Sequence, residues 1–407
     1  MMKAFKYRLY PTAQQADALQ FTLDRNRELY NAALEERREA WRMSRVSVTY
    51  AMQSAQLPDI KEIRPEYKEI YSQVLQDTLK RVDKAFKAFF KRVKEGNPPG
   101  FPRFQGYDRY DSFTYPQGGF SLTHENRVCL SKIGSIKVKL HRGVQGSVKT
   151  CTIKREGACW YGVFACEVEL QPHLPSTDEA VGIDLGLLHF ATLSTGDTIE
   201  NPRHYRKAEK KVAKVQQEVS RKKRGSHRRK KAVARLSQAY RNVRNQRNDH
   251  LHQWSHRLVN TYEVLVFEDI KPANLSKRPA PKQDEEGKYL PNGASAKAGL
   301  NKSILDAGWS QFILFCEYKA ACAGTHVMRV DPKYTSQMCS GCGAIQKKEL
   351  DERWHSCSCG CELDRDHNAA INILRIGLSG EPLRPKRSQA RTEPSEDAPL
   401  RSPAIHG

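Results

Sequence analysis

The segment Ala180-Val-Gly-Ile-Asp-Leu-Gly186 is a short apolar strand with a carboxylate, Asp184, in its middle. An ionised carboxylate in such a strand is costly unless it is paired or bound to a metal ion. A hairpin follows, with a strand at residues 190–194 and a turn at 195–197. These features predict an α/β domain with an acidic residue built into its sheet.

Two acidic residues further along the chain have comparable settings. Glu268 lies near the C-terminal end of a second apolar strand, residues 264–270, and catalytic groups in α/β folds gather at strand ends. Asp366 lies just before, or in the first turn of, a helix predicted from the apolar spacing of residues 369–374. Two alternatives stay open at this point: Asp269 could replace Glu268 as a ligand, and Asp364 could be a helix cap.

Acidic residues that converge in this way could hold a pair of Mg²⁺ ions, because Mg²⁺ prefers oxygen ligands in near-octahedral geometry. Two such ions ~4 Å apart can activate a water and stabilise the leaving oxygen of a phosphodiester. The ordered trio therefore predicts a phosphodiester-cleaving centre, with Asp184, Glu268 and Asp366 as catalytic residues and magnesium ligands.

Five of the eleven cysteines fall between residues 339 and 361, a clustering typical of metal ligands rather than of disulfides. Cys339-Ser-Gly-Cys342 is a zinc knuckle, and its partner is the irregular Cys357-Ser-Cys359-Gly-Cys361. We predict that Cys339, Cys342, Cys357 and Cys359 hold one Zn²⁺ ion, with Cys361 in place of Cys357 as the alternative. Four sulfur ligands leave no position for water, so the predicted role is structural.

The composition bounds the class of protein. The chain has 407 residues, enough for two to three folded units, and a formal net charge of +22. No apolar run reaches the ~18 residues of a membrane span, and the N-terminus has no apolar stretch of signal-peptide length. We therefore expect a soluble, intracellular protein whose partner is a polyanion.

Most of the excess charge lies in one window. Residues 203–247 contain 18 lysines and arginines but two acids, which accounts for +16 of the net charge. Few intrahelical ion pairs can offset this repulsion, so a partner of opposite charge should. The pattern predicts two basic helices joined at a Gly225-Ser226 turn. The residues predicted to contact phosphate backbones are Arg221, Lys222, Lys223, Arg224, Arg228, Arg229, Lys230 and Lys231.

The N-terminal part begins with a predicted strand at residues 5–10, which Pro11 ends. Thr12 and Gln15 then have capping-box spacing, and two amphipathic helices follow. We expect their apolar stripes to be core. The stripes are Leu19, Leu23, Tyr30, Leu34 and Trp41 in the first helix, and Leu75, Leu79, Val82, Phe86, Phe89 and Val93 in the second.

Short strands rich in Val, Ile and Tyr fill residues 100–173 and predict a small antiparallel β-barrel, which the opening strand could join. Residues 172–176 have the composition of a linker. Residues 276–299 have no apolar period and predict a mobile loop. Residues 379–407 are rich in Pro, Ser and charge and predict a disordered tail.

Seven motifs occur in a fixed order along residues 1 to 377. They are Tyr7-Arg-Leu-Tyr-Pro11, Gly100-Phe-Pro-Arg-Phe104, Val181-Gly-Ile-Asp-Leu-Gly186, Phe267-Glu-Asp269, Asp306-Ala-Gly-Trp309, Cys339-Ser-Gly-Cys342 and Asp364-Arg-Asp-His-Asn-Ala-Ala370. Together they resemble TnpB, the family of RNA-guided DNA endonucleases of bacterial insertion sequences, formerly called OrfB-type transposases. The family is similar to type V CRISPR effectors. The chain departs from the family's pattern in its second knuckle, which is Cys-x-Cys rather than Cys-x-x-Cys.

The resemblance implies a nuclease of RNase H fold and assigns Asp184, Glu268 and Asp366 to the family's catalytic triad. The implied domains are an N-terminal wedge barrel (1–11 and 96–175), a helical recognition lobe that interrupts it (12–95), a RuvC-like nuclease domain (176–335 and 363–378) and an inserted zinc ribbon (336–362).

The resemblance also implies partners: a guide RNA made from the element's end, and double-stranded DNA cut beside a short target-adjacent motif. It implies a prokaryotic, cytoplasmic, nucleoid-associated protein. Candidate motif-reading residues are Tyr107, Arg109, Ser112 and Phe113. The alternatives are a nuclease-silent RNA-guided repressor, a transposase that acts without RNA, and service as a CRISPR effector.

Overall fold

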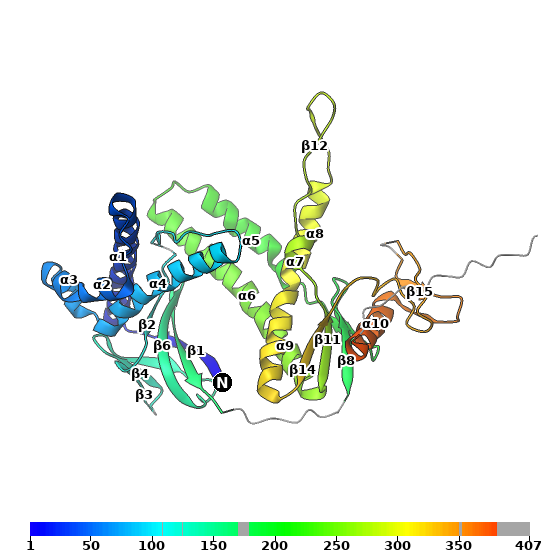
Figure 1. Cartoon of the computed structure of the whole chain (residues 1–407), viewed down its shortest axis with the longest axis horizontal. Coiled ribbons are helices and arrows are strands. Elements are labelled where there is room, and N and C mark those ends of the chain that lie inside the picture. Colours follow the sequence, from blue (N-terminus) through cyan, green and yellow to red (C-terminus); the bar gives the residue numbers. More distant parts are fainter. Residues whose placement is uncertain (108, 124, 170–178, 350–351, 381–407) are drawn as a thin grey trace, which may run out of the picture. The chain divides into compact units, whose positions relative to one another are not determined.

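The computed structural model describes residues 1–107, 109–123, 125–169, 179–349 and 352–380, and divides the chain into two compact units, residues 1–170 and 171–407 (Figure 1). The predicted linker and all but the first two residues of the predicted tail lie outside the described residues. None of the described helices is both long and apolar enough to cross a membrane.

The first unit contains a seven-stranded antiparallel sheet of order β2-β6-β7-β1-β5-β4-β3. The strands are β1 (Met2–Tyr10), β2 (Ser112–Tyr115), β3 (Phe120–Thr123), β4 (Arg127–Leu130), β5 (Gly134–Lys139), β6 (Ser147–Glu156) and β7 (Cys159–Glu167). The opening strand therefore pairs with strands more than a hundred residues later, the possibility that the sequence left open. Phe5, Tyr7 and Leu9 alternate along β1 and point into the core.

Helices pack on this sheet and share its core. They are α1 (Ala13–Ser44), α2 (Tyr50–Ala55), α3 (Leu57–Ile63), a 3₁₀ turn (Pro65–Glu69) and α4 (Ser72–Lys94). The predicted capping box of Thr12 and Gln15 begins α1. The expected apolar stripes are core only in part, because Trp41 is 53% exposed and Val93 is 51% exposed at the C-terminal ends of their helices.

The second unit is built on a five-stranded mixed sheet of order β10-β9-β8-β11-β14. Its strands are β8 (Ala180–Asp184), β9 (His189–Leu193), β10 (Thr198–Glu200), β11 (Val264–Glu268) and β14 (His326–Val330). The predicted hairpin is present, since β9 pairs antiparallel with β8 and with β10. β8, β11 and β14 are parallel, so their carboxyl ends meet at one edge of the sheet.

Helices cover both faces of the second sheet. α6 (His227–Thr261) and α9 (Trp309–Ala323) form one core with Leu265 and Phe267 of β11. α10 (Arg365–Ser379) lies on the other face beside β8 and packs on Val266 (Figure 1). Gly182 makes this possible, because a Cβ at that position would lie 2.1 Å from the carbonyl oxygen of Ala370.

The prediction of a mobile loop over residues 276–299 is wrong in part, because the segment contains regular secondary structure. After α7 (Pro272–Leu275), a short hairpin of β12 (Lys282–Gln283) and β13 (Tyr289–Leu290) projects beyond the end of α8 (Ala294–Ala307) (Figure 1). The helix therefore begins inside the predicted loop. Alanines at 294, 296 and 298 favour helix without providing an apolar stripe, which is why the periodicity missed it.

Candidate catalytic centre and cysteine cluster

The pairing of β8 with β11 brings Asp184 and Glu268 to the same side of the sheet. Successive side chains of a strand point to opposite faces. Gly182 faces α10, so Asp184, two residues later, lies on that face as well. Val266 also packs against α10, so Glu268 at the end of β11 shares the face. The two carboxylates thus come from the carboxyl ends of adjacent parallel strands.

Asp366 is brought to the same place by the start of α10. Asp364 is the N-cap of this helix, since its side chain accepts hydrogen bonds from the amides of Asp366 (2.8 Å) and His367 (3.2 Å). Asp366 therefore lies in the first turn, and the possibility that Asp364 is a cap is confirmed. A Cβ on Gly186 would lie 3.8 Å from Asp366 Oδ2, so this carboxylate lies against the segment that follows Asp184.

The electrostatics link Asp184 to both other acids. Burial, reinforced by the negative charges of Glu268 and Asp366, raises the pKa of Asp184 well above its ordinary value. Burial and the neighbouring Asp364 raise the pKa of Asp366. Burial also raises the pKa of Glu268, although the hydrogen bond that Thr335 Oγ1 donates to Glu268 Oε1 lowers it. Such a cluster favours either protonation or a bound cation, and carboxylate oxygens are the ligands that Mg²⁺ prefers.

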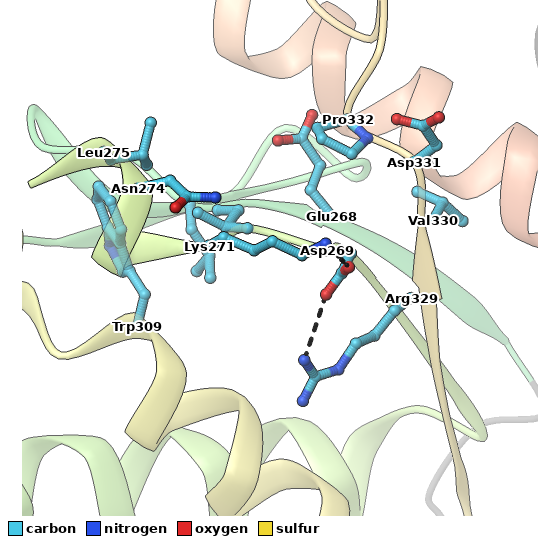
Figure 2. A pocket seen from close by; sticks show the side chains of 12 residues that line it. Glu268, Asp269, Lys271, Asn274, Leu275, Trp309, Arg329, Val330, Asp331 and Pro332 are labelled. Carbon is cyan, nitrogen blue, oxygen red and sulfur yellow. Dashed lines mark hydrogen bonds and ion pairs between the residues drawn. The ribbon is translucent and has the colours of Figure 1, made fainter. Parts of the chain in front are cut away.

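Asp269, the open alternative to Glu268, has a different environment. Its carboxylate pairs with Arg329 (3.5 Å) and with Lys271 (3.7 Å). Figure 2 shows the Glu268 and Asp269 carboxylates on opposite sides of the strand end, with Asp269 directed toward Arg329. Of the two, Glu268 is therefore the residue that joins Asp184.

A cleft of about 940 Å³ opens beside Glu268 (Figure 2). Leu185 and Trp309 contribute apolar walls, and Lys271 and Arg329 contribute positive charge. Asp331, which directly follows β14, also lines the cleft, and its negative charge raises the pKa of Glu268. Of the three acids, Glu268 is the one that lines this open space, which has both charged and apolar walls.

The cysteine cluster has the geometry of a tetrahedral site. The sulfurs of Cys339, Cys342, Cys357 and Cys359 all lie within 4.8 Å of one another. The Cys339–Cys359 and Cys342–Cys357 pairs are both 3.6 Å apart. Tetrahedral zinc with bonds of ~2.3 Å separates its sulfur ligands by ~3.8 Å, so the donor set fits Zn²⁺.

Cys361 lies outside this group of four. Its sulfur is 3.8 Å from Ser340 Oγ, and it forms a separate group with Cys339 and His355. Gly360, with φ +86°, turns the chain between Cys359 and Cys361, and the amide of Cys357 donates to the carbonyl of Cys361 (3.0 Å). The geometry therefore favours Cys357 over Cys361 as the fourth ligand.

The predicted pair of basic helices is present as α5 (His204–Ser220) and α6. Gly225 has φ +80°, and Ser226 caps α6 by accepting from the amide of Arg229 (3.1 Å). Residues 221–224 form the exposed connection, and Arg228, Lys230 and Lys231 are exposed in the first turn of α6. Arg229 is half-buried and donates to the carbonyl of Val219 (2.9 Å), so it stabilises the turn itself.

The candidate motif-reading residues have unlike surroundings. Tyr107 is 55% exposed, with the guanidinium groups of Arg27 and Arg155 over its ring. Arg109 is exposed, and Ser112 is partly exposed. Phe113 is fully buried in the core of the first unit, so the prediction is wrong for this residue. The aromatic ring of Phe113 fills the core, because alternate residues of β2 face inward.

Sequence reasoning missed several residues around the acidic centre. Thr335 bonds to Glu268, and two fully buried asparagines, Asn368 and Asn372, lie along α10. The signal was present in the sequence: asparagines four residues apart within an otherwise apolar helical stripe need partners that only tertiary structure supplies.

The fold resembles that of a solved Cas12-type effector. A solved Cas12f1–guide RNA–target DNA complex matches the fold with a TM-score of 0.51 at 13% identity, over 92% of this chain and 98% of that one. The mini-RNA-guided endonuclease Cas_phi3 matches with a TM-score of 0.50 at 9% identity, over 95% and 94%.

The chain belongs to the TnpB family, also called OrfB of the IS605 type. A family model described as "Probable transposase" (OrfB_IS605) matches residues 163–278, and one described as "Cas12f1-like, TNB domain" matches residues 309–373. A third, described as "Helix-turn-helix domain", matches residues 1–45. The structure has strand β1 and a single uninterrupted helix, α1, over these residues.

Curated relatives agree with this membership. A protein of Streptomyces pristinaespiralis named "Putative RNA-guided DNA endonuclease" is 34% identical, covering 96% of this chain and 94% of its own. InsQ of Escherichia coli K12, with the same description, is 32% identical over 92% of each chain. The CRISPR-associated endodeoxyribonuclease Cas12f1 of Sulfoacidibacillus thermotolerans is 27% identical over 53% of this chain and 49% of its own.

Proposed function

We propose that this protein is an RNA-guided, Mg²⁺-dependent DNA endonuclease associated with a transposable element. The observation that supports the proposal is the position of Asp184 and Glu268 on the face of the sheet that α10 covers, with Asp366 in the first turn of that helix. The relative at 34% identity, named for the same activity, supports it.

The three acids would act as the ligands of two Mg²⁺ ions. When bound, the ions supply an activated water and stabilise the leaving oxygen of the phosphodiester. Thr335 orients Glu268 through its hydroxyl, and the capped first turn of α10 orients Asp366. Lys271 and Arg329 also line the cleft, where each is paired with Asp269.

Cys339, Cys342, Cys357 and Cys359 would hold one Zn²⁺ ion. All four coordination positions would be filled by sulfur, so the ion would stabilise the fold and take no part in hydrolysis.

The nucleic acids would be a guide RNA from the element's end and a double-stranded DNA target with a short adjacent motif. Base pairing with the guide would supply sequence specificity. The exposed basic residues of the α5–α6 connection would contact phosphates. The first unit would serve as wedge barrel and recognition lobe, and the protein would act in the prokaryotic cytoplasm, at the nucleoid.

The test is to express the protein with its native flanking DNA, sequence the bound RNA and assay cleavage of a matching duplex. Asp184→Asn should lower cleavage by at least about 100-fold, because even outer-shell changes at metal sites cost ~10–100-fold. Asp269→Asn is the matched control, since the neighbouring acid pairs with Arg329 instead, and it should cleave normally.

The proposal fails if Asp184→Asn cleaves like the unmodified protein. Cleavage by protein stripped of RNA would instead indicate a transposase that acts without a guide. Guide-dependent binding of the target without cutting would indicate a repressor.

A further inference from the structure

Two asparagines of α10, Asn368 and Asn372, are completely buried one helical turn apart. Their neighbours Ala369, Ala370 and Ile373 pack as apolar core. A buried amide needs hydrogen-bond partners, because leaving it without them costs free energy that an apolar side chain would not. These two positions therefore do something other than fill space.

Their partners all belong to one segment, residues 335–340. Asn372 Nδ2 donates to the carbonyl oxygens of Thr335 (2.9 Å) and Met338 (2.7 Å). Asn368 Nδ2 donates to the same Met338 carbonyl (2.7 Å), and Asn368 Oδ1 accepts from the amide of Ser340 (2.9 Å). The two side chains thus bind the segment at both ends.

This segment reaches both sites. At one end, the hydroxyl of Thr335 donates to the carboxylate of Glu268. At the other end, Ser340 lies between Cys339 and Cys342, two members of the cysteine cluster. Asn368 lies two residues after Asp366 on the same helix. The segment is therefore hydrogen-bonded to Glu268 at one end and runs into the cysteine cluster at the other, and Asn368 bonds it to the helix that carries Asp366.

We propose that Asn368 and Asn372 are positioning residues that lock the cysteine knuckle onto α10, so that metal binding by the cysteines sets the geometry of the acidic centre. The inference rests on the proposed nuclease centre, because it assigns a task to residues around it. Neither asparagine touches the acids directly; both act through the backbone of residues 335–340.

The physical reason is that α10 needs a second attachment. Its contact with Gly182 determines how closely the helix approaches β8. Hydrogen bonds add a directional constraint to this packed contact, because they weaken steeply when they are misaligned. The asparagine bonds hold the helix relative to the segment that also holds Glu268. The carboxylates of Asp366 and Glu268 are then held in a fixed position relative to each other, which a centre for two ions requires.

The experiment uses Asn372→Leu, which keeps the side-chain size and removes both donated bonds. Asn301→Leu is the matched control, because Asn301 also donates its amide to a backbone carbonyl, that of Ser276 (2.8 Å), but from α8. Binding of Mn²⁺, as a probe for Mg²⁺, is measured by electron paramagnetic resonance. Cleavage by the guide-loaded protein is measured against Mg²⁺ concentration.

We expect Asn372→Leu to weaken Mn²⁺ binding and to raise the Mg²⁺ concentration for half-maximal cleavage by ~10–100-fold, the range typical of outer-shell residues. Target binding and zinc content should stay unchanged, and the visible spectrum of the Co²⁺-substituted protein should keep its tetrahedral thiolate bands. A loss of folded protein alone would lower the amplitude of cleavage and leave the Mg²⁺ dependence as it was, and this result would overturn the inference.

A double-mutant cycle tests the link to the cysteines. Introduced alone, Cys342→Ser should weaken Mn²⁺ binding. Combined with Asn372→Leu, it should have little further effect, because both changes interrupt the same connection. Fully additive effects would contradict the inference. Asn368→Leu provides an independent second variant and should behave like Asn372→Leu.

Failure of the inference differs from failure of the proposed function. If Asp184→Asn weakens Mn²⁺ binding but neither asparagine variant does, the acidic centre stands and the positioning role is wrong. If Asp184→Asn leaves Mn²⁺ binding unchanged, the proposed centre is wrong and the inference is wrong with it.

Discussion

At the scale of single residues, the arrangement of the acids works against stability. Asp184 is placed in a strand where burial and two neighbouring carboxylates oppose its charge. A residue chosen for folding alone would be apolar at this position, as Val181 and Ile183 are. This loss of folding stability is consistent with a centre that binds divalent cations, since functional sites often contain interactions that destabilise the fold.

This crowding predicts a pH dependence of the metal-free protein. Because the pKa of Asp184 is raised in the folded state, the folded protein retains a proton that the unfolded chain loses above pH ~4. The contribution of Asp184 to the free energy of unfolding should therefore fall as pH rises, and Asp184→Asn should remove that fall. Urea unfolding at several pH values, with chelator present, measures both.

The matched control for this measurement is Asp269→Asn, whose carboxylate is paired with Arg329 on the other side of the strand end. It should show the pH profile of the unmodified protein. Added Mg²⁺ should stabilise the unmodified protein more at high pH than at low pH. An identical pH profile for Asp184→Asn and the unmodified protein would show that Asp184 is not held among repelling charges.

At the scale of elements, the position of α10 decides whether the centre forms. The helix carries Asp366 in its first turn, and it can approach β8 only because residue 182 has no side chain. Gly377 lets the same helix pack on Val266, since a Cβ there would lie 2.5 Å from Val266 Cγ1. Small residues on both elements thus set the distance between the sheet acids and the helix acid.

Gly182→Ala should push α10 away from β8, because the added Cβ meets backbone that cannot give way. We expect a loss of about 1–3 kcal/mol in the free energy of unfolding, as for other overpacked sites. Cleavage should fall more than guide RNA binding does. Chemical denaturation and cleavage assays on the same samples provide the comparison.

Gly106→Ala is the control for added bulk, because a Cβ at Gly106 would have no atom within 4 Å. Its stability and activity should match those of the unmodified protein. If Gly182→Ala behaved like Gly106→Ala, the close packing of α10 on β8 would not be required for the site.

The α5–α6 connection allows a second prediction at this scale. Replacing Lys222 and Lys223 with alanine removes two exposed charges. Each phosphate contact with single-stranded RNA contributes ~0.7 to the slope of log affinity against log salt concentration, so the magnitude of this slope should fall by about 1.4. Replacing Lys282 and Lys288, on and beside the β12–β13 hairpin, removes the same charge elsewhere. Guide RNA titrations at several salt concentrations should show the change only in the first pair; equal slopes would argue against phosphate contacts there.

At the scale of the whole molecule, the chain consists of two units with separate cores. The core of the first unit joins β1 and its partner strands to α1 and α4. The cores of the second unit lie on the two faces of the β8–β11–β14 sheet. The cysteine cluster and the acidic centre both belong to the second unit, so loss of one should affect the other before it affects the first unit.

Removal of the proposed zinc ion should therefore lower the stability of one unit selectively. In Cys342→Ser we expect less zinc, a lower folded yield and a lower unfolding temperature for the second unit, while the first unit unfolds as before. Metal analysis and proteolysis followed by mass spectrometry distinguish the units. Cys322→Ser, which changes a half-buried cysteine of the second unit outside the cluster, is the control. Equal loss of protection in both units would contradict this prediction.

Local patterns in the sequence determined most of the elements. The capping box at Thr12, the turn at Gly225 and the apolar strands around Asp184 and Glu268 depend on near neighbours, and all are present. The cysteine spacing likewise indicated the four sulfurs that come together. Local spacing did not determine the direction of every side chain. It left open whether Glu268 or Asp269 faces the helix, and whether Phe113 faces solvent.

Tertiary structure alone decided which side chains meet. The alternation of β11, set by its pairing with β8, turns Glu268 toward Asp184 and leaves Asp269 to Arg329. The partners of Asn368 and Asn372 lie some thirty residues away in sequence and become neighbours only when α10 packs on the sheet. The physical reason is that strand and helix periods are local, whereas the contacts that orient a buried polar group come from whichever distant segment packing brings beside it.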